Sequence, residues 1–125
     1  MNKSKEKVFH CNVELTLDII AGKWKPLILH HIGNSDPIRY GELKRKIPNI
    51  NQRVLSRQLR ELEKDKLIKR DVYDEVPLRV EYSVTKVGAS LTPILNALGN
   101  WGIKYNQAFN YGKIYFENQY DTSNC

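Results

Sequence analysis

Residues 39–65, RYGELKRKIPNINQRVLSRQLRELEKD, decide the fold of this chain. They predict a short helix over 39–46, a brief turn over 48–50, and a longer helix that Asn51 caps and that runs to about Asp65. The proline that begins the turn disfavours helix at the residue before it, so the two helices stay separate. A helix, a tight turn and a second helix at this spacing are typical of a helix-turn-helix.

The hydrophobic period changes to two after this unit, which indicates strands. A first strand covers 67–73, an exposed loop covers 75–78, and a second strand, RVEYSVT, covers 79–85. The second strand alternates strictly and places three apolar side chains on one face: Val80, Tyr82 and Val84. The predicted fold class is therefore α+β, mainly α: a winged helix-turn-helix with a two-stranded wing.

Two helices are predicted before this unit. Asn12 caps a first helix over 13–21, which Gly22 closes; the apolar residues also alternate as in a strand, but the caps favour helix. The stretch GKWKPLILHHIG, 22–33, predicts a second helix with its proline in the first turn and Gly33 at its end.

A last long helix begins at Thr85 or Lys86. Pro93 lies inside its pattern and predicts either a kink or a late start of the helix. Helical spacing places the apolar residues of this segment on one side: Leu91, Ile94, Leu95, Leu98 and Trp101, with Tyr105 and Phe109 beyond.

The length of 125 residues fits one domain. We expect a polar lead-in over 1–10, the domain over 11–109 and a tail over 110–125. No signal peptide and no apolar run of about 18 residues is visible, so no membrane partner is expected. The two cysteines, Cys11 and Cys125, lie at opposite ends and form no disulfide framework, which favours a reducing cytoplasm.

The positive charge is concentrated in the predicted helix-turn-helix and wing. The net charge is +6, and the stretch from Arg39 to Lys86 holds thirteen Lys or Arg against eight Asp or Glu. An excess of this kind suggests an anionic partner such as nucleic acid.

The helix that follows Asn51 has two opposite faces. Leu55, Leu59 and Leu62 fall within a narrow arc, which is the expected core face. The opposite face is basic, and two polar residues flank it near the helix start: Arg53, Arg57, Arg60 and Lys64, with Gln52 and Ser56. A recognition helix has this arrangement, because its N-terminal half reads base edges in the major groove and its cations meet phosphates.

A basic stripe on an isolated helix is often only a solvated face. Here the stripe has nearly one sign, lies on the second helix of a helix-turn-helix and precedes a wing, which together favour DNA contact. Arg79 at the wing is a candidate for a backbone or minor-groove contact, although Asp74 and Glu75 weaken that case. Arg39 and the cations at 44–46 either reach phosphates or form a solvated face.

The chain resembles the HxlR-type family of winged-helix regulators, relatives of the MarR type. The resemblance covers roughly 11–109 and is carried by an ordered series of matches: Cys11, GKW at 22–24, LIL at 27–29, RYGEL at 39–43, LSRQLRELEKDKLIKR at 55–70, P-x-R-V-E-Y-S-V-T-x-x-G at 77–88, and Trp101-Gly102. The family often has Gly where Lys66 stands, so we expect a less tight turn before the wing.

The resemblance implies a bacterial transcription regulator. It implies a homodimer that forms through the first and last helices. This dimer binds an inverted-repeat operator in double-stranded DNA, with half-sites about one or two turns apart. It also implies that the helix after Asn51 is the recognition helix. Several members sense oxidants or electrophiles through a cysteine just before the first helix, the place that Cys11 occupies.

Two interpretations of Cys11 stay open. A helix N-terminus, His10 and the nearby Lys5 and Lys7 favour the thiolate form, which is the reactive one. Alternatively, the side chain is a small buried hydrophobe in the dimer interface. Sensing also requires a resolving thiol, and Cys125 is the only other one in the chain.

Other classes of function fit less well. The histidines, His10, His30 and His31, have no metal-ligand spacing, and no phosphate loop or nucleophile elbow is present, so neither an enzyme nor a cofactor is expected. A winged helix can serve as a protein-interaction module without DNA binding, and structured RNA is a further alternative without an aromatic platform to support it. The sequence identifies no small-molecule effector; Trp24 and Trp101 fit a core or interface better than a ligand cage.

Overall fold

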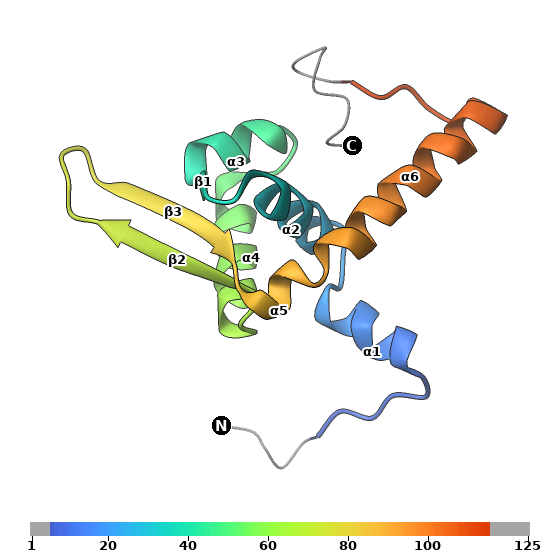
Figure 1. Ribbon diagram of the computed structural model, residues 1–125, viewed down its shortest axis with the longest axis horizontal. Helices are drawn as coiled ribbons and strands as arrows, with labels where there is room; N and C mark the ends of the chain where they lie inside the picture. Colours follow the sequence, from blue (N-terminus) through green and yellow to red (C-terminus); the bar gives the residue numbers. More distant parts are fainter. Residues whose placement is uncertain (1–5, 116–125) are drawn as a thin grey trace.

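The computed structural model describes residues 6–115 and has the winged helix-turn-helix fold that the sequence predicts. Figure 1 shows that α1 (Asn12–Ile19) and α6 (Thr92–Phe109) project from the body of the molecule. The elements in chain order are α1 (Asn12–Ile19), α2 (Trp24–Ser35), β1 (Ile38–Arg39), α3 (Tyr40–Lys46), α4 (Gln52–Lys64), β2 (Ile68–Tyr73), β3 (Arg79–Val84), α5 (Lys86–Ala89) and α6 (Thr92–Phe109).

The sheet has three strands rather than the two predicted. Its order is β1-β3-β2, with both pairings antiparallel, and Ile38 of β1 lies opposite Tyr82 of β3. The sequence prediction missed β1 because two residues are too few to show a period of two. Arg39 therefore ends a strand and precedes α3, instead of beginning the helix as predicted.

The core lies between α2, α3, α4 and the sheet. The predicted face of β3 is confirmed, since Tyr82 is buried and Val80 and Val84 pack half-buried against the core. The fully buried apolar side chains come from α2, β1, α3, α4, β2 and the turn before α4: Ile28, Leu29, Ile32, Ile38, Leu43, Ile50, Leu55, Leu62 and Ile68. This shared core fixes α4 relative to α3, which is what a helix-turn-helix requires.

Two helix ends differ from the prediction. Asn12 is the first residue of α1 rather than its cap; Cys11 holds the cap position and makes no side-chain cap hydrogen bond. The second helix runs past Gly33 to Ser35. A Cβ on Gly33 would collide with the side chain of Thr92, so this glycine allows α6 to approach α2 instead of ending the helix.

The last helical segment is divided in two. Thr85 caps the short α5, because its Oγ1 accepts a hydrogen bond of 3.0 Å from the Gly88 N–H. The long α6 begins only at Thr92, with Pro93 in its first turn, where a missing N–H is harmless. The prediction of one helix from Thr85 is therefore wrong, and its alternative of a late start at the proline is right.

The turn between α4 and the wing is tight, contrary to expectation. Lys66 has a left-handed backbone with φ of 65°. The Lys66 N–H donates to the Glu63 carbonyl and the Leu67 N–H donates to the Leu62 carbonyl, both at 3.0 Å, which is the Schellman pattern of a helix end. Lysine thus takes the conformation that glycine adopts with less strain.

The projecting helices α1 and α6 leave apolar side chains in solvent. No residue of α1 is buried, and in α6 only Leu95 is. The apolar side predicted for the last helix is therefore largely exposed; Trp101, for example, is 65% exposed. Within residues 6–115, no helix is both long and apolar enough for a membrane crossing.

Candidate nucleic-acid interface

The exposed side of α4 carries the residues predicted to touch DNA. Leu55, Leu59 and Leu62 are buried, and the opposite side presents the basic face, which we define as Arg53, Arg57, Arg60 and Lys64. All four of its cations are exposed, as is Gln52. Within the described range, none of the four forms a hydrogen bond or an ion pair with another residue, so their charges are available to an external anion.

The N-terminal end of α4 is held by polar contacts. Asn51 caps it as predicted, because its Oδ1 accepts a hydrogen bond of 2.9 Å from the Val54 N–H. The Tyr40 hydroxyl of α3 lies 3.4 Å from both the Gln52 carbonyl and the Ser56 Oγ. Ser56 is half-buried beside that ring, so it lies less open to DNA than its place in the sequence suggests.

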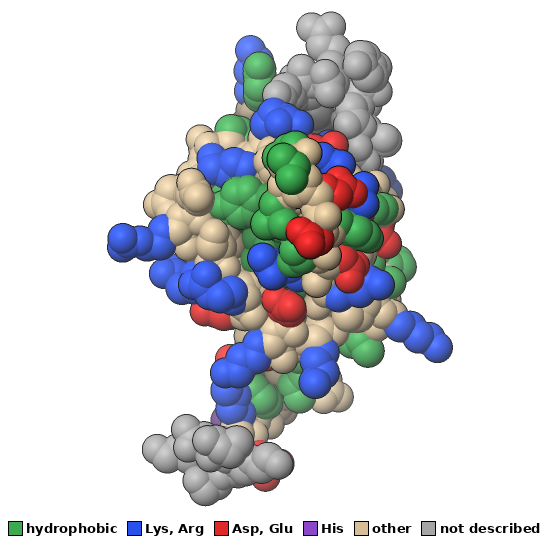
Figure 2. All heavy atoms as spheres, turned by 90° about the vertical axis from the view of Figure 1, so that its left-hand side faces the viewer, with side chains coloured by type: hydrophobic (Ala, Val, Ile, Leu, Met, Phe, Trp, Pro, Cys, Tyr) green, Lys and Arg blue, Asp and Glu red, His purple; other side chains and the backbone are tan. Residues whose placement is uncertain are grey.

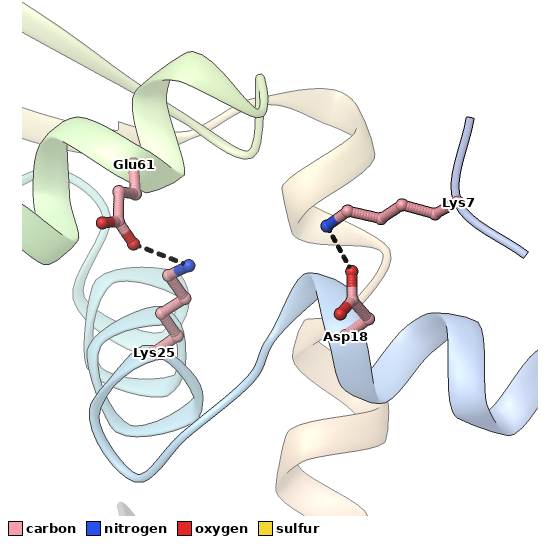
Figure 3. A network of polar contacts seen from close by, with 4 residues as sticks. All are labelled: Lys7, Asp18, Lys25 and Glu61. Atoms are coloured by element: carbon pink, nitrogen blue, oxygen red, sulfur yellow. Dashed lines mark hydrogen bonds and ion pairs between the residues drawn. The ribbon is translucent and has the colours of Figure 1, made fainter. Parts of the chain in front are cut away.

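Lys25 of α2 makes a second contact with α4 that the sequence analysis missed. Its Nζ lies 2.9 Å from Glu61 Oε1, and its side chain is only 12% exposed (Figure 3). The hydrogen bond and the charge of Lys25 lower the pKa of Glu61, and Arg57 and Arg60 lower it further. No sequence spacing indicates this pair, because its members belong to elements that only the fold brings together.

Arg39 and the α3 cations lie beside α4. Arg39 is exposed, and its backbone N–H donates a 3.0 Å hydrogen bond to Glu42 Oε1, which satisfies one free donor at the start of α3. Arg45 is exposed, while Lys44 and Lys46 are half-buried. Contact of Arg39 with DNA stays a prediction.

The wing holds its own arginine. Arg79 Nη2 lies 3.2 Å from Glu75, its Nε lies 3.9 Å from Glu81, and its guanidinium covers the Tyr73 ring at 3.9 Å. Figure 2 looks at the wing tip: acidic and hydrophobic side chains gather near the centre, and Lys and Arg side chains project around them. Arg79 is therefore engaged within the wing, although its predicted DNA contact is not tested by this arrangement.

Cys11 is exposed at the start of α1. Its predicted cationic neighbours have acidic partners. Lys7 Nζ lies 2.8 Å from Asp18, an interaction visible in Figure 3 that raises the pKa of Lys7. The ring Nδ1 of His10 lies 3.7 Å from Glu14 Oε1, and the backbone N–H of His10 donates a 2.7 Å hydrogen bond to the same oxygen. Lys5 and Cys125 lie outside the described residues.

Aromatic side chains line a groove of about 950 Å³ near the end of α6. The Trp101 and Tyr105 rings stack at 5.0 Å, and Tyr111 meets Tyr105 edge-on at 5.9 Å. Two 2.8 Å hydrogen bonds join the Asn106 side chain to the backbone of Gly112 and so hold one wall. Trp24 does not line this groove; it packs half-buried against the core.

Among residues 6–115, no three His, Cys, Asp or Glu side chains converge as metal ligands.

Comparisons with known proteins agree on one family. The model of the HxlR-like helix-turn-helix family matches residues 19–110. The HTH-type transcriptional regulator YkvN of Bacillus subtilis is 46% identical over 92% of both chains.

Solved structures of regulators share this fold. A transcriptional regulator of the MarR family from Porphyromonas gingivalis is 43% identical with a TM-score of 0.73, over 80% of this chain and 97% of that one. The oxidized redox regulator HypR is 46% identical with a TM-score of 0.70, over 75% and 96%. This chain belongs to the HxlR-like helix-turn-helix family of transcriptional regulators, and it carries their DNA-binding domain.

Proposed function

We propose that this protein binds an inverted-repeat operator as a homodimer, with α4 in the major groove of each half-site. The observation that carries the proposal is the basic face of α4, whose exposed cations have no partner in the described range. Gln52 and Arg53 lie in the first turn of α4, which supports a role in reading base edges. In this proposal Arg57, Arg60 and Lys64 meet phosphates. Arg39 and Arg79 are the outer candidates for backbone contacts.

The dimer would form through α1 and α6. Both helices project from the body with apolar side chains in solvent, and an exposed apolar surface of this kind is typical of a protein–protein interface (Figure 1). The domain proposed here covers 11–109, with the lead-in before it and the tail after it. Two copies related by a twofold axis would place two α4 helices to face a palindromic site.

Selection of genomic DNA by the purified protein tests this function. We expect enrichment of a palindromic site and a gel shift whose affinity falls steeply with salt, because cation–phosphate contacts release counterions. Footprinting should protect two half-sites about 10 base pairs, or a multiple of that, apart. Equal affinity for the selected site and a scrambled duplex would contradict it and would favour a protein-interaction module.

We further propose that modification of Cys11 weakens operator binding. The thiol is exposed at the N-terminal cap of α1, one of the two helices assigned to the dimer. A regulator 46% identical to this chain is a redox regulator. An adduct at this position would change how α1 meets the partner subunit, and with it the spacing of the two α4 helices.

Titration with N-ethylmaleimide tests this switch, because the Cys11 sulfur adds to the maleimide and leaves a bulky thioether. Operator affinity should fall in step with the adduct measured by mass spectrometry. A Cys125→Ser variant isolates the effect of Cys11, and a Cys11→Ser variant serves as the unreactive control. Unchanged affinity at complete modification of Cys11 would refute the switch while leaving DNA binding intact.

A further inference from the structure

Glu61 is the acidic residue of α4 whose carboxylate competes with an external anion for a cation of the basic face. Residues four apart are neighbours on a helix surface, so Glu61 lies within reach of Arg57, and ion pairs at this spacing form readily. Both Arg57 and Arg60 already act on the Glu61 carboxylate at a distance. An arginine bound to this carboxylate would have less charge to offer a phosphate.

In the folded chain the Glu61 carboxylate contacts Lys25 of α2 instead of Arg57. Glu61 Oε1 bonds Lys25 Nζ at 2.9 Å, and Lys25 reaches it from α2, which packs on the inner side of α4 (Figure 3). The Lys25 side chain is only 12% exposed, while that of Glu61 is 45% exposed. A cation on a side chain with so little contact with water is stabilised by a neighbouring anion, and the Glu61 carboxylate supplies it.

We propose that Lys25 is a positioning residue for DNA recognition: it holds the Glu61 carboxylate against α2 and thereby leaves the Arg57 guanidinium free for DNA. The inference rests on the proposed function of the basic face. It adds a role for a buried residue that touches no DNA itself. Without Lys25, Glu61 turns toward Arg57, and the protein must break that ion pair before Arg57 meets a phosphate.

The test compares five variants of the full chain on one duplex from the genomic selection and on a scrambled duplex of equal length. Lys25→Met keeps the apolar stem of the side chain and removes its charge. We expect operator affinity to fall roughly two- to fivefold, the strength of a surface ion pair. The slope of log affinity against log salt should fall by up to about one unit, as for one lost phosphate contact.

Rescue separates this role from a merely structural one. Glu61→Gln breaks the same ion pair but also removes the competing carboxylate, so it should bind at least as tightly as wild type. Lys25→Met/Glu61→Gln should recover wild-type affinity and salt slope. The matched control, Lys25→Met/Glu63→Gln, removes an exposed acid of the same helix and the same charge, and it should recover less.

Equal weakening by Lys25→Met and Glu61→Gln would overturn the proposal, as would a double variant no better than Lys25→Met. Circular dichroism checks that each variant is folded, and Lys25→Gln replaces Lys25→Met if that variant unfolds. Arg57→Ala separates the two levels of inference. If wild type binds no operator, or if Arg57→Ala leaves affinity unchanged, the proposed basic face fails; if Arg57→Ala weakens binding and Lys25→Met does not, only the role of Lys25 fails.

Discussion

The α4 helix and the wing are adjacent in the chain, but their charged side chains are arranged in opposite ways. The α4 helix carries four Lys or Arg against two Glu, and its cations stand free in solvent. The stretch 71–81, which holds the tip of the wing, carries one arginine against four Asp or Glu, and that arginine is engaged by Glu75 and Glu81. Charge available to a ligand thus differs from charge present in the sequence.

The two regions also differ in what holds them. One side of α4 is packed into the core, with Leu59 only 2% exposed, whereas the tip of the wing has no core of its own and Val76 is fully exposed. The packed core therefore holds the basic face of α4 in a fixed position. Recognition of DNA bases requires such fixed placement of the side chains. The wing is held instead by strand pairing and by the contacts of Arg79.

The largest expected effect is on protein stability, through the packing of α4 in the core. Leu59→Ala should lower the free energy of unfolding by about 2–5 kcal/mol, because it removes buried methyl groups and leaves a cavity. Val76→Ala at the wing tip serves as the control and should change stability by less than about 0.5 kcal/mol. Urea denaturation followed by circular dichroism measures both. Similar losses for the two variants would refute the difference in packing.

The second effect compares an arginine of each region in DNA binding. Arg53→Ala in α4 should cost about 1–3 kcal/mol on the operator if it reads a base. Arg79→Ala should cost less, because its charge is already balanced by two carboxylates within the wing. Fluorescence anisotropy on operator and scrambled duplexes provides the measurement. A larger loss from Arg79→Ala would make the wing the principal reading element.

The third effect concerns the residue that joins the two regions. Lys66→Gly should relieve about 1–2 kcal/mol of left-handed strain, while the freer unfolded chain offsets about 0.4–1 kcal/mol. The net result is a gain in stability of about 0 to 1.6 kcal/mol, measurable as a higher melting temperature. Gly22 already has positive φ with open space around it, so Gly22→Ala should instead destabilise the protein. A melting temperature lowered by Lys66→Gly would contradict the strain.

The smallest effect is the pH dependence of the Lys25–Glu61 pair. Because the pKa of Glu61 is lowered in the folded protein, the stability from this pair is present above the ordinary glutamate pKa and is lost as pH falls through the folded value. In acid, the free energy of unfolding of the wild type should therefore no longer exceed that of Glu61→Gln. Denaturation followed from pH 7 into acid measures this loss, and an advantage in stability that does not decline with pH would show that the carboxylate charge contributes nothing.

Local patterns predicted most of the fold because the decisive signals lie within a few residues. The cap at Asn51, the leucine face of α4 and the alternation of Val80, Tyr82 and Val84 follow from helix and strand periods alone. Errors occurred where a boundary depends on distant groups. The second helix continues through Gly33 because α6 packs there, and two residues become β1 only because β3 pairs with them.

The features of the candidate site likewise fall into those that local patterns predict and those that depend on contacts between elements. The basic face could be read from the sequence, because residues on one helix keep a fixed angular relation. The contacts of Lys25 with Glu61 and of Tyr40 with the start of α4 could not, since sequence separation does not report spatial distance between elements. The engagement of Arg79 within the wing likewise appeared only when β2 and β3 paired.

The sequence by itself therefore determined that this is a winged helix-turn-helix with a basic face on α4, because helix and strand periods and the leucine stripe are encoded locally. The tertiary structure decided which of the cations remain free. Packing α4 on α2 gave Glu61 a partner in Lys25, and pairing β2 with β3 brought the Tyr73 ring under the Arg79 guanidinium. The availability of a charge depends on every group within a few ångströms, and only the folded chain determines those neighbours.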